Sequence, residues 1–300
     1  MIRLGLCCKF EEQPIKFYTT TATALLKLKK PEATQKISSL CLKNALSLQE
    51  SLNFCSKNHI GSFRVNSQIL PLKTHPQVGY DIQDLPDGKE IIRAFKQCNT
   101  FRQKNNLRLT FHPDQFILLS SPNQGVTDRS IADLNYQAQV SEWIGADVIN
   151  IHGGGAYGDK KTALEQVARN LKRLSKAVRS RLTFENDDKT YTPADLLPLC
   201  QKEGIPLVYD VHHHRCNPDQ LSIEAATKLA LATWDREPLF HISSPKEGWS
   251  GPDRNRHHDY IDMKDFPQSW RKHSLTIEVE AKAKELAVRD FYKSLSGQGH

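Results

Sequence analysis

The stretch "LVYDVHHHRCNP", Leu207 to Pro218, joins an apolar run to an aspartate and three consecutive histidines. The run, "PLVY" (206–209), is apolar at nearly every position. Runs without polar alternation are typical of parallel strands that are buried on both faces. The aspartate and the histidines would therefore stand where such a strand ends, which is where parallel α/β folds place their ligands.

Seven further runs of the same kind occur along the chain. They span residues 2–6, 60–65, 107–111, 148–151, 182–184, 239–242 and 275–279. Between the runs, apolar residues recur at three- and four-residue steps, which is the pattern of an amphipathic helix. These helical stripes cover about residues 37–55, 88–104, 128–144, 160–178, 193–203 and 222–233.

Eight strands separated by helices predict an α/β fold, the (β/α)₈ TIM barrel. An open doubly wound sheet is the rival fold, but it usually carries a glycine-rich phosphate loop after its first strand. The segment "LGLCCKFEEQP", at the end of the first run, contains no such loop. No internal repeat, low-complexity block or flexible linker interrupts the chain, so we expect residues 1–300 to form a single barrel domain.

The composition sets weaker limits on function. Of the 300 residues, 38% are hydrophobic, and the formal net charge of +7 is compatible with a polyanionic partner such as nucleic acid. The seven cysteines form no C-x-x-C pair, which argues against a disulfide framework or a thiolate zinc site. No apolar run approaches the length of a membrane span and no signal peptide is visible, so we expect a cytoplasmic protein.

Ionisable residues stand at the ends of the third to sixth strands, within the seventh and at the end of the eighth. In that order they are His112, His152, Glu185, Asp210, His241 and Glu280. A single such residue is more often a helix cap or a satisfied polar group, whereas residues from a whole ring of strands converge on the barrel axis. Clustered carboxylates and imidazoles would repel one another and lose solvation, and bound cations remove both costs.

Histidine and carboxylate ligands without thiolate suit Zn²⁺, Mn²⁺ or Fe²⁺, and they are too many for one tetrahedral ion. The sequence therefore predicts two or three divalent metal ions. Metal ions about 3.5–4 Å apart stabilise the attacking and the leaving oxygen of a phosphoryl displacement. Phosphodiester hydrolysis is accordingly the first function to consider.

Two long connections, residues 66–87 and 243–260, hold further candidates, because loops of this length in a compact fold are often functional. His75 lies in the first connection and the pair His257 and His258 in the second. Their spacing alone does not decide between a ligand and a surface histidine. The segment "HGGGAYGDK" (152–160) resembles a phosphate-binding loop, although its glycines also suit a close approach of backbone to metals or ligand.

The assembled motifs resemble those of the ultraviolet damage endonuclease family, metal-dependent barrel enzymes related in fold to endonuclease IV and xylose isomerase. The resemblance covers most of the chain, and the motifs agree in order and spacing as well as in residues. They are "MIRLG", "SFRVNSQILPLKTHP", "HPDQF", "IHGGGAYGDK", "FENDD", "DVHHHRCNP", "HISS" and "VEAKAKE".

The resemblance implies two or three divalent ions, with Mn²⁺ favoured and Zn²⁺ or Fe²⁺ as alternatives. It implies a metal-ligand role for His75, His112, His152, Glu185, Asp210, His213, His241, His258 and Glu280. Of these ligands, Glu185, His152 and Glu280 are expected to be essential for catalysis.

The resemblance also distinguishes the three histidines of "DVHHH". The ligands would be Asp210 and His213, while His212 and His214 would not bind metal. Period-two alternation along a strand would instead place His212 and His214 on the side of Asp210. The family pattern is preferred because the chain leaves the strand at this point.

The reaction that the resemblance implies is attack of a metal-bound hydroxide on the phosphodiester immediately 5′ of a damaged dinucleotide in double-stranded DNA. Family proteins bend the duplex and extrude the lesion, and two side chains after the third strand probe the gap. Here these are Gln115 and Phe116, an amide that can bond to base edges and an aromatic ring that can stack. The competing interpretation of Phe116 is a core residue. No obligate protein partner is evident.

Four positions depart from the family pattern. Leu6 and Phe10 stand where family members carry a tyrosine and an asparagine that help to read the lesion, and Phe116 replaces a tyrosine. Leu239 stands where some members carry a lysine that can be carbamylated near the metals. Two other functions therefore stay open: a metal-dependent isomerase or iron-dependent oxidase of a small molecule, and a DNA-binding module with a vestigial metal site.

Overall fold

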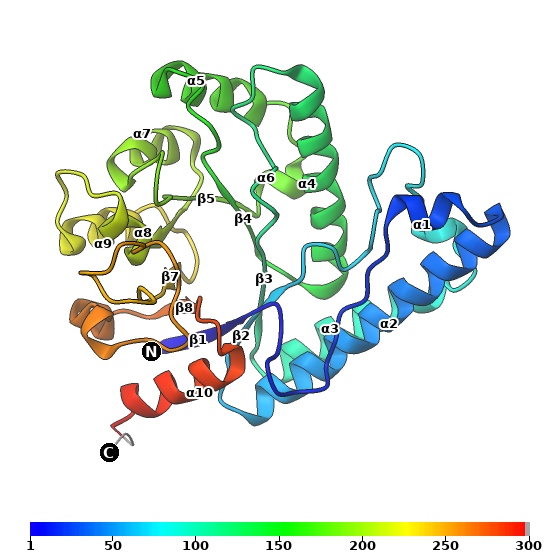
Figure 1. The fold of residues 1–300 in the computed structure, drawn as a ribbon, viewed down its shortest axis with the longest axis horizontal. Coiled ribbons are helices and arrows are strands. Elements are labelled where there is room, and N and C mark those ends of the chain that lie inside the picture. The colour runs from blue at the N-terminus through cyan, green and yellow to red at the C-terminus, as the bar shows by residue number, and fades with distance from the viewer. Residues whose placement is uncertain (298–300) are drawn as a thin grey trace.

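Eight parallel strands close into a barrel in chain order, with β8 returning to β1 (Figure 1). The computed structural model describes residues 1–297. The strands are β1 (Ile2–Cys7), β2 (Ser62–Val65), β3 (Arg108–Phe111), β4 (Val148–His152), β5 (Leu182–Glu185), β6 (Leu207–Asp210), β7 (Leu239–Ile242) and β8 (Leu275–Val279). The predicted (β/α)₈ barrel is confirmed, and every strand begins and ends within two residues of its predicted bounds.

The strand register determines which strand-end residues become neighbours. His152 of β4 pairs with Glu185 of β5, and Asp210 of β6 pairs with His241 of β7. Because the strands are parallel, these residues meet at the same, carboxyl end of the barrel.

Helices connect the strands and surround the barrel (Figure 1). They are α1 (Ala22–Leu26), α2 (Lys30–Lys57), α3 (Gly88–Lys104), α4 (Gln124–Ile144), α5 (Lys160–Leu171), α6 (Lys176–Arg179), α7 (Pro193–Glu203), α8 (Val211–Cys216), α9 (Ile223–Leu231) and α10 (Lys284–Leu295), with the short 3₁₀ turns η1 (Ile82–Asp84), η2 (Met263–Asp265) and η3 (Gln268–Lys272). Within residues 1–297, none of the helices combines the length and the hydropathy needed to cross a lipid bilayer.

Local sequence signals explain where the well-predicted helices begin and end. At the start of α7, the side chains of Thr192 and Asp195 each accept a hydrogen bond from the other's backbone N–H, and Pro193 occupies the first helical position. The side chain of Asn123 caps the start of α4, and Gly145, with φ of +74°, is the C-cap that follows its last residue. The predicted bounds 88–104 and 193–203 coincide with α3 and α7.

Three helices, α1, α8 and α10, are absent from the sequence prediction. The short helix α8 matters most, because it follows β6 without a loop. Asp210 is both the last residue of β6 and the N-cap of α8, and its Oδ1 accepts a hydrogen bond from the backbone N–H of His213 at 2.8 Å. The consecutive histidines therefore lie on a helical turn.

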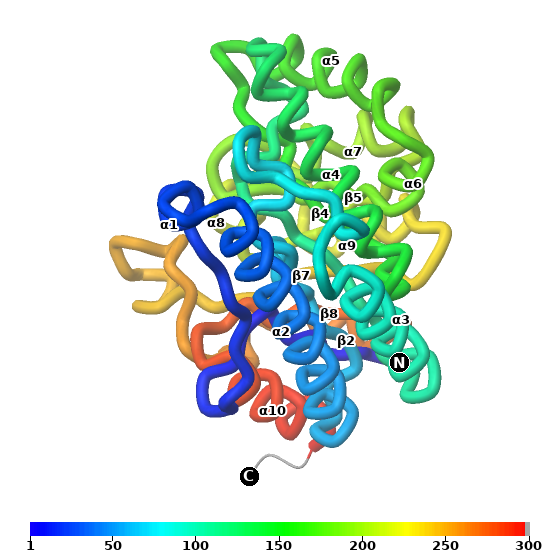
Figure 2. Tube along the Cα trace, turned by 90° about the vertical axis from the view of Figure 1, so that its right-hand side faces the viewer, coloured from blue at the N-terminus to red at the C-terminus, as the bar shows by residue number. Residues whose placement is uncertain are grey.

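The main hydrophobic core lies between the strands and the surrounding helices. Leu48 and Leu52 of α2 and Phe95 of α3 are buried there, and these two helices lie side by side against the barrel (Figure 2). Inside the barrel, the residues next to the carboxyl end are polar instead. The buried polar side chains of these strands include Arg64, Thr110, Asn150, Thr183 and Glu278. Buried polar groups need partners, and these residues find them in the site described next.

Candidate metal centre

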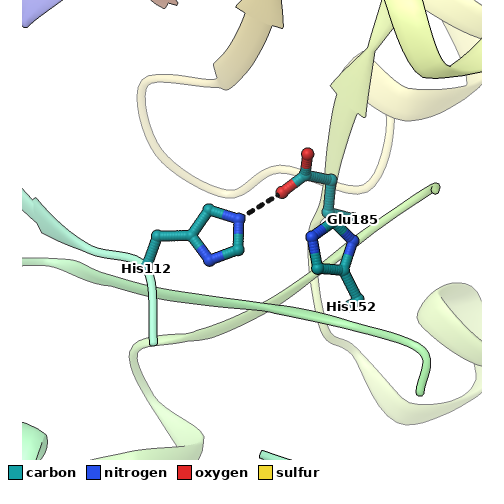
Figure 3. Close-up of side chains that lie close together, drawn as sticks. All are labelled: His112, His152 and Glu185. Atoms are coloured by element: carbon teal, nitrogen blue, oxygen red, sulfur yellow. Dashed lines mark ion pairs between the residues drawn. The ribbon is translucent and has the colours of Figure 1, made fainter. Parts of the chain in front are cut away.

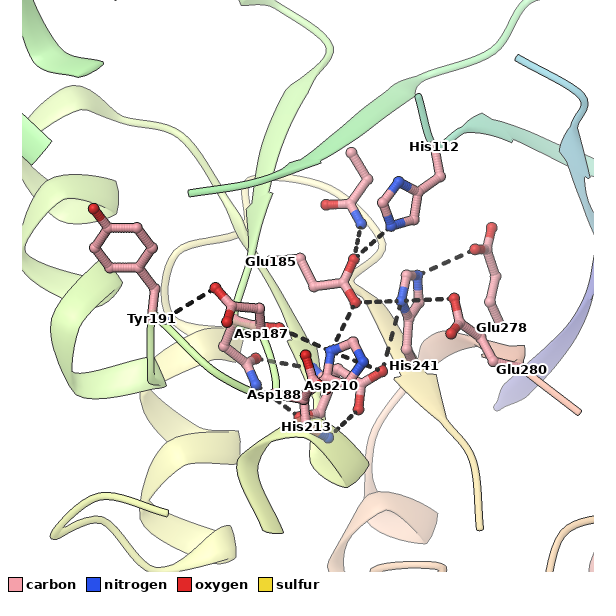
Figure 4. A network of polar contacts seen from close by, with 12 residues as sticks. His112, Glu185, Asp187, Asp188, Tyr191, Asp210, His213, His241, Glu278 and Glu280 are labelled. Carbon is pink, nitrogen blue, oxygen red and sulfur yellow. Dashed lines mark hydrogen bonds and ion pairs between the residues drawn. The ribbon is translucent and has the colours of Figure 1, made fainter. Parts of the chain in front are cut away.

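Seven of the sequence-predicted ligands come together at the carboxyl ends of β3 to β8, and Figure 4 labels all of them except His152. Their ligating atoms form three overlapping groups, and within each group the atoms lie within 4.8 Å of one another. The groups are His112, His152 and Glu185; Glu185, Asp210 and His213; and His112, His241 and Glu280. Because two groups share Glu185 and two share His112, the arrangement is a continuous cluster.

The first group joins β3, β4 and β5 (Figure 3). Nε2 of His112 lies 2.9 Å from Oε2 of Glu185, and the rings of His112 and His152 are 5.1 Å apart between centroids. Nδ1 of His152 is buried and has no hydrogen-bond partner among residues 1–297. Glu185 is fully buried, and Asn150 donates a hydrogen bond to its Oε2 at 2.5 Å.

In the second group, Asp210 and His213 are the residues of "DVHHH" that face the cluster. Nδ1 of His213 lies 3.4 Å from Oε1 of Glu185 and 3.6 Å from Oδ2 of Asp210. Because α8 begins at Val211, positions three apart share a helical face, which brings Asp210 and His213 together. The expectation from strand alternation fails here, since the chain is helical after Asp210.

The other two histidines of this turn have different environments. His214 lies between the hydroxyl of Tyr209, at 2.7 Å, and Oδ1 of Asp219, at 3.0 Å. His212 is buried against the rings of Trp249 and His257, each 5.2 Å away between centroids. His214 therefore anchors α8 to its surroundings rather than facing the cluster.

The third group is contacted by a cation that sequence reasoning missed, Arg64. Arg64 of β2 lies 2.6 Å from Oε1 of Glu280 and 2.5 Å from Oε2 of Glu278, and its Nη2 lies 2.9 Å from Nε2 of His241. Glu278 also accepts a hydrogen bond from the hydroxyl of Thr110. The only sequence signal for Arg64 is a charged residue within the apolar run "IGSFRV".

The pKa values show how strongly the cluster favours charged carboxylates. Burial alone would raise the pKa of Glu185, but His241 and His152, followed by His112, hold that pKa well below its usual range. Burial likewise opposes ionisation of Glu278, yet Arg64 and His241 lower its pKa to about 2. The carboxylates of Glu185 and Glu278 therefore remain charged.

The cluster has the donor set of a metal site. Its carboxylates, Glu185, Asp210, Glu278 and Glu280, face one permanent cation within residues 1–297, Arg64. The remaining negative charge must be balanced by protons on the imidazoles or by bound cations; burial opposes protonation of His241, yet Glu185 raises its pKa to about 10.

A buried carboxylate oxygen without a hydrogen-bond donor also indicates a cation site. Oδ2 of Asp210 is buried and accepts no hydrogen bond from any residue in 1–297. A buried acceptor without a partner costs about 1–3 kcal/mol, more if charged. The residues present therefore fit divalent metal ions.

Two predicted ligands lie outside the cluster. His75 lines a cleft of about 280 Å³ with Pro113 and Asp114, on the connection that leaves β2. His258 is exposed, and its Nδ1 accepts a hydrogen bond from the backbone N–H of Tyr260 at 3.0 Å.

The neighbour of His258 is the histidine that approaches the cluster. Nδ1 of His257 lies 3.8 Å from Oε2 of Glu280, and its ring centroid lies 6.4 Å from that of His213. An antiparallel bridge between Pro245 and His257 folds the connection after β7 back towards that strand. The spacing of the pair left both members open, and the family resemblance implied His258 as the ligand.

The two predicted DNA-probing residues lie on the loop after β3. Gln115 is exposed and Phe116 is 70% exposed. The interpretation of Phe116 as a core residue is therefore wrong.

The positions that depart from the family pattern are buried or packed. Leu6 is fully buried, and Phe10 packs against the rings of Phe54 and Phe63. Leu239 belongs to a small apolar cluster with Val148. These side chains supply apolar packing at positions where the resemblance implies polar groups.

A closed parallel barrel with histidines and carboxylates at its carboxyl end defines a class, the metal-site enzymes of the TIM-barrel fold. Comparison with known proteins identifies the family within that class. The chain belongs to the UV-endonuclease UvdE family, whose model matches residues 2–299. The resemblance inferred from the sequence motifs is thus confirmed.

Individual relatives agree with this assignment. The chain is 36% identical over 293 residues to the UV DNA damage endonuclease of Bacillus thuringiensis subsp. konkukian (strain 97-27), covering 93% of this chain and 89% of that protein. It matches the crystal structure of SacUVDE with a TM-score of 0.87 at 26% identity, covering 99% of both chains. Endonuclease IV from Thermus thermophilus, with a TM-score of 0.59, 14% identity and coverage of 84% and 95%, shares the fold.

Proposed function

We propose that this protein is a metal-dependent DNA repair endonuclease that hydrolyses the phosphodiester bond 5′ of ultraviolet photoproducts and other lesions in double-stranded DNA. The observation that carries the proposal is the convergence of His112, Glu185 and Asp210, with four further predicted ligands, on one end of the barrel. Family membership supplies the substrate class, because the curated relatives are named UV DNA damage endonucleases.

The proposed cofactor is two or three divalent ions, with Mn²⁺ favoured. The proposed ligands are His112, His152, Glu185, Asp210, His213, His241, His257 and Glu280, in which His257 takes the place first expected of His258. His75 stays a prediction, since it lies on the connection after β2 beside Asp114. When bound, the ions supply an activated water and stabilise charge on phosphoryl oxygens.

The protein's own groups position that chemistry. Asn150, itself held by the hydroxyl of Thr183 at 2.9 Å, donates to Glu185 and fixes its carboxylate. Arg64 fixes the Oε1 side of Glu280. Such outer partners orient metal ligands and tune their basicity. On the rim, exposed Phe116 is available to stack against bases that the bent duplex unstacks.

The function is tested by nicking of supercoiled plasmid with and without prior ultraviolet irradiation. We expect Mn²⁺-dependent nicking of irradiated plasmid in preference to unirradiated plasmid, and loss of nicking in EDTA. Mapping of the cut ends should give a 3′-hydroxyl and a 5′-phosphate on the 5′ side of the lesion. Equal nicking of both plasmids would refute lesion recognition, and no nicking with any divalent ion would refute the hydrolase.

A matched pair of variants tests the ligand set. His257→Ala should bind less metal than the wild type, because His257 lies beside Glu280, whereas His258→Ala should bind the wild-type amount. Elemental analysis after gel filtration measures the difference. The reverse result, with metal lost only in His258→Ala, would restore the original expectation.

A further inference from the structure

The loop after β4 carries an exposed aromatic ring on a strained backbone. Tyr157 is 52% exposed and has φ of +49°. Residues other than glycine are uncommon in this left-handed region, and a bulky residue held there marks strain that clusters at functional sites. The exposed ring and the strained backbone each cost stability, and Tyr157 gains no burial in the hydrophobic core in return.

The glycines of "GGGAYGD" (153–159) explain how this loop is held. A Cβ added to Gly153 would lie 2.6 Å from Cδ2 of Tyr191, and one added to Gly154 would lie 2.3 Å from the hydroxyl of Ser120. The loop is therefore packed between the connection after β3, which carries Phe116, and the segment after β5. The hydroxyl of Tyr191 also donates to the carbonyl of Gly155 at 3.3 Å.

The glycine loop is not built as a phosphate cradle. The carboxylate of Asp159 accepts hydrogen bonds from the backbone N–H groups of Lys161 and Thr162, each at 3.2 Å. The amino end of α5 thus already holds an anion, and a second negative group there would be repelled. The exposed side chain of Tyr157 is therefore the group of this loop that is available to contact a ligand.

We propose that Tyr157 is a base-stacking residue of the DNA-binding face, a second aromatic contact beside Phe116 on the neighbouring loop. This inference rests on the proposed function. The exposed lysines 160 and 161 follow directly in the sequence, and an aromatic ring next to cations is the combination that binds unstacked nucleic acid. The loop of Tyr157 begins directly after His152, a member of the metal cluster, so a base stacked on Tyr157 would lie at the same end of the barrel as that cluster.

The test compares Tyr157→Gly with Tyr157→Phe in steady-state nicking of an irradiated oligonucleotide duplex. Tyr157→Gly should raise KM about tenfold, the scale of one lost base stack, with a much smaller change in kcat. Tyr157→Phe should keep the wild-type KM, because the ring face is retained. The thermal midpoint of Tyr157→Gly should be unchanged or higher, because glycine adopts positive φ without strain.

Two controls distinguish a failure of the Tyr157 inference from a failure of the proposed function. Leu46→Ala, which truncates an apolar side chain 47% exposed on α2, should leave KM unchanged. A 2-aminopurine beside the lesion should stay quenched on binding by the wild type and by Tyr157→Phe, because it stacks on the ring, but its fluorescence should rise on binding by Tyr157→Gly. A wild-type KM and wild-type quenching in Tyr157→Gly would overturn the inference. A wild-type enzyme without preference for irradiated duplex would overturn the proposed function instead.

Discussion

At the amino end of the barrel, the arginine side chains lie next to carboxylates. Nε of Arg3 lies 2.8 Å from Oε1 of Glu237, and Arg108 meets Asp147 through two nitrogens, at 3.0 and 2.8 Å. Arg236 also lies 3.7 Å from Asp147. These arginines therefore face carboxylates, and the charges at this end compensate one another.

The carboxyl end uses the same residue types without that compensation. Glu185, Asp210 and two further glutamates face Arg64 alone among the permanent cations of residues 1–297, and the remaining neighbours are imidazoles. Both ends are built from residues on or beside barrel strands, so the fold does not impose the difference. At this end the carboxylates outnumber the permanent cations and depend on protons or metal ions for the rest of their balance, which is the property expected of a cation-binding site.

The largest expected effect comes from removing Arg64, the one permanent cation within residues 1–297 that pairs with the glutamates of the cluster. Arg64→Met would leave Glu278 and Glu280 buried beside each other's charge, and loss of one partner of a buried pair costs about 3–5 kcal/mol. Urea unfolding in EDTA measures the free energy of unfolding. Arg3→Met at the amino end, where the pair is partly exposed, should cost much less.

A double variant shows whether the pair itself is responsible. Arg64→Met combined with Glu278→Met replaces a buried ion pair by apolar groups, which is often neutral in stability, so much of the loss should be recovered. If Arg64→Met alone is as stable as the wild type, the carboxyl end tolerates uncompensated charge by itself, and the contrast between the two ends disappears.

The second effect concerns the residue that joins two ligand groups. Glu185→Gln keeps the shape of the side chain but removes its charge from both groups, so the metal content should fall. Nicking should drop by more than about 100-fold, because loss of a residue that only supports a metal ligand already costs about 10- to 100-fold. Elemental analysis and plasmid nicking measure this. Glu203→Gln, at the end of α7, is the matched control. Wild-type metal content in Glu185→Gln would remove Glu185 from the site.

Much of the fold could be predicted because buried parallel strands are apolar along their length. The run 239–242 coincides with β7. The helix α8 could not be predicted in the same way, because Asp210 ends a strand and caps a helix at once. Apolar periodicity also gives no signal for a helix as short as Val211–Cys216.

The site was predictable where chemistry follows strand position. His112 and Glu280, for example, were found because they stand at strand ends. Arg64 and Glu278 were missed because each lies inside an apolar run, and their contact joins residues 214 apart in sequence. The choice between His257 and His258 depends on the turn of a loop, which neighbouring identical residues cannot reveal.

The third effect is the pH dependence of the stability that Mn²⁺ adds by binding at the carboxyl end. Saturating Mn²⁺ should stabilise the protein by about 2.7 kcal/mol at a concentration a hundred times Kd. This gain should shrink as the pH falls from about 8 to about 5.5, because protons compete for imidazole ligands. Thermal unfolding with Mn²⁺ or EDTA at each pH measures it, and Glu185→Gln serves as the control. A metal effect independent of pH would exclude histidine ligands.

The smallest effect belongs to the amino end. Burial opposes ionisation of Glu237, but hydrogen bonds from Arg3 and Thr276 lower its pKa. A carboxylate with a depressed pKa contributes stability above its unfolded pKa, about 4.3, and loses that contribution as the pH falls through the lower folded value. Glu237→Gln should therefore cost about 1 kcal/mol at neutral pH and less at about pH 3. Its metal content and nicking should equal those of the wild type, since the charges of this end are already paired. A metal-dependent change in Glu237→Gln would mean that the two ends of the barrel are energetically coupled.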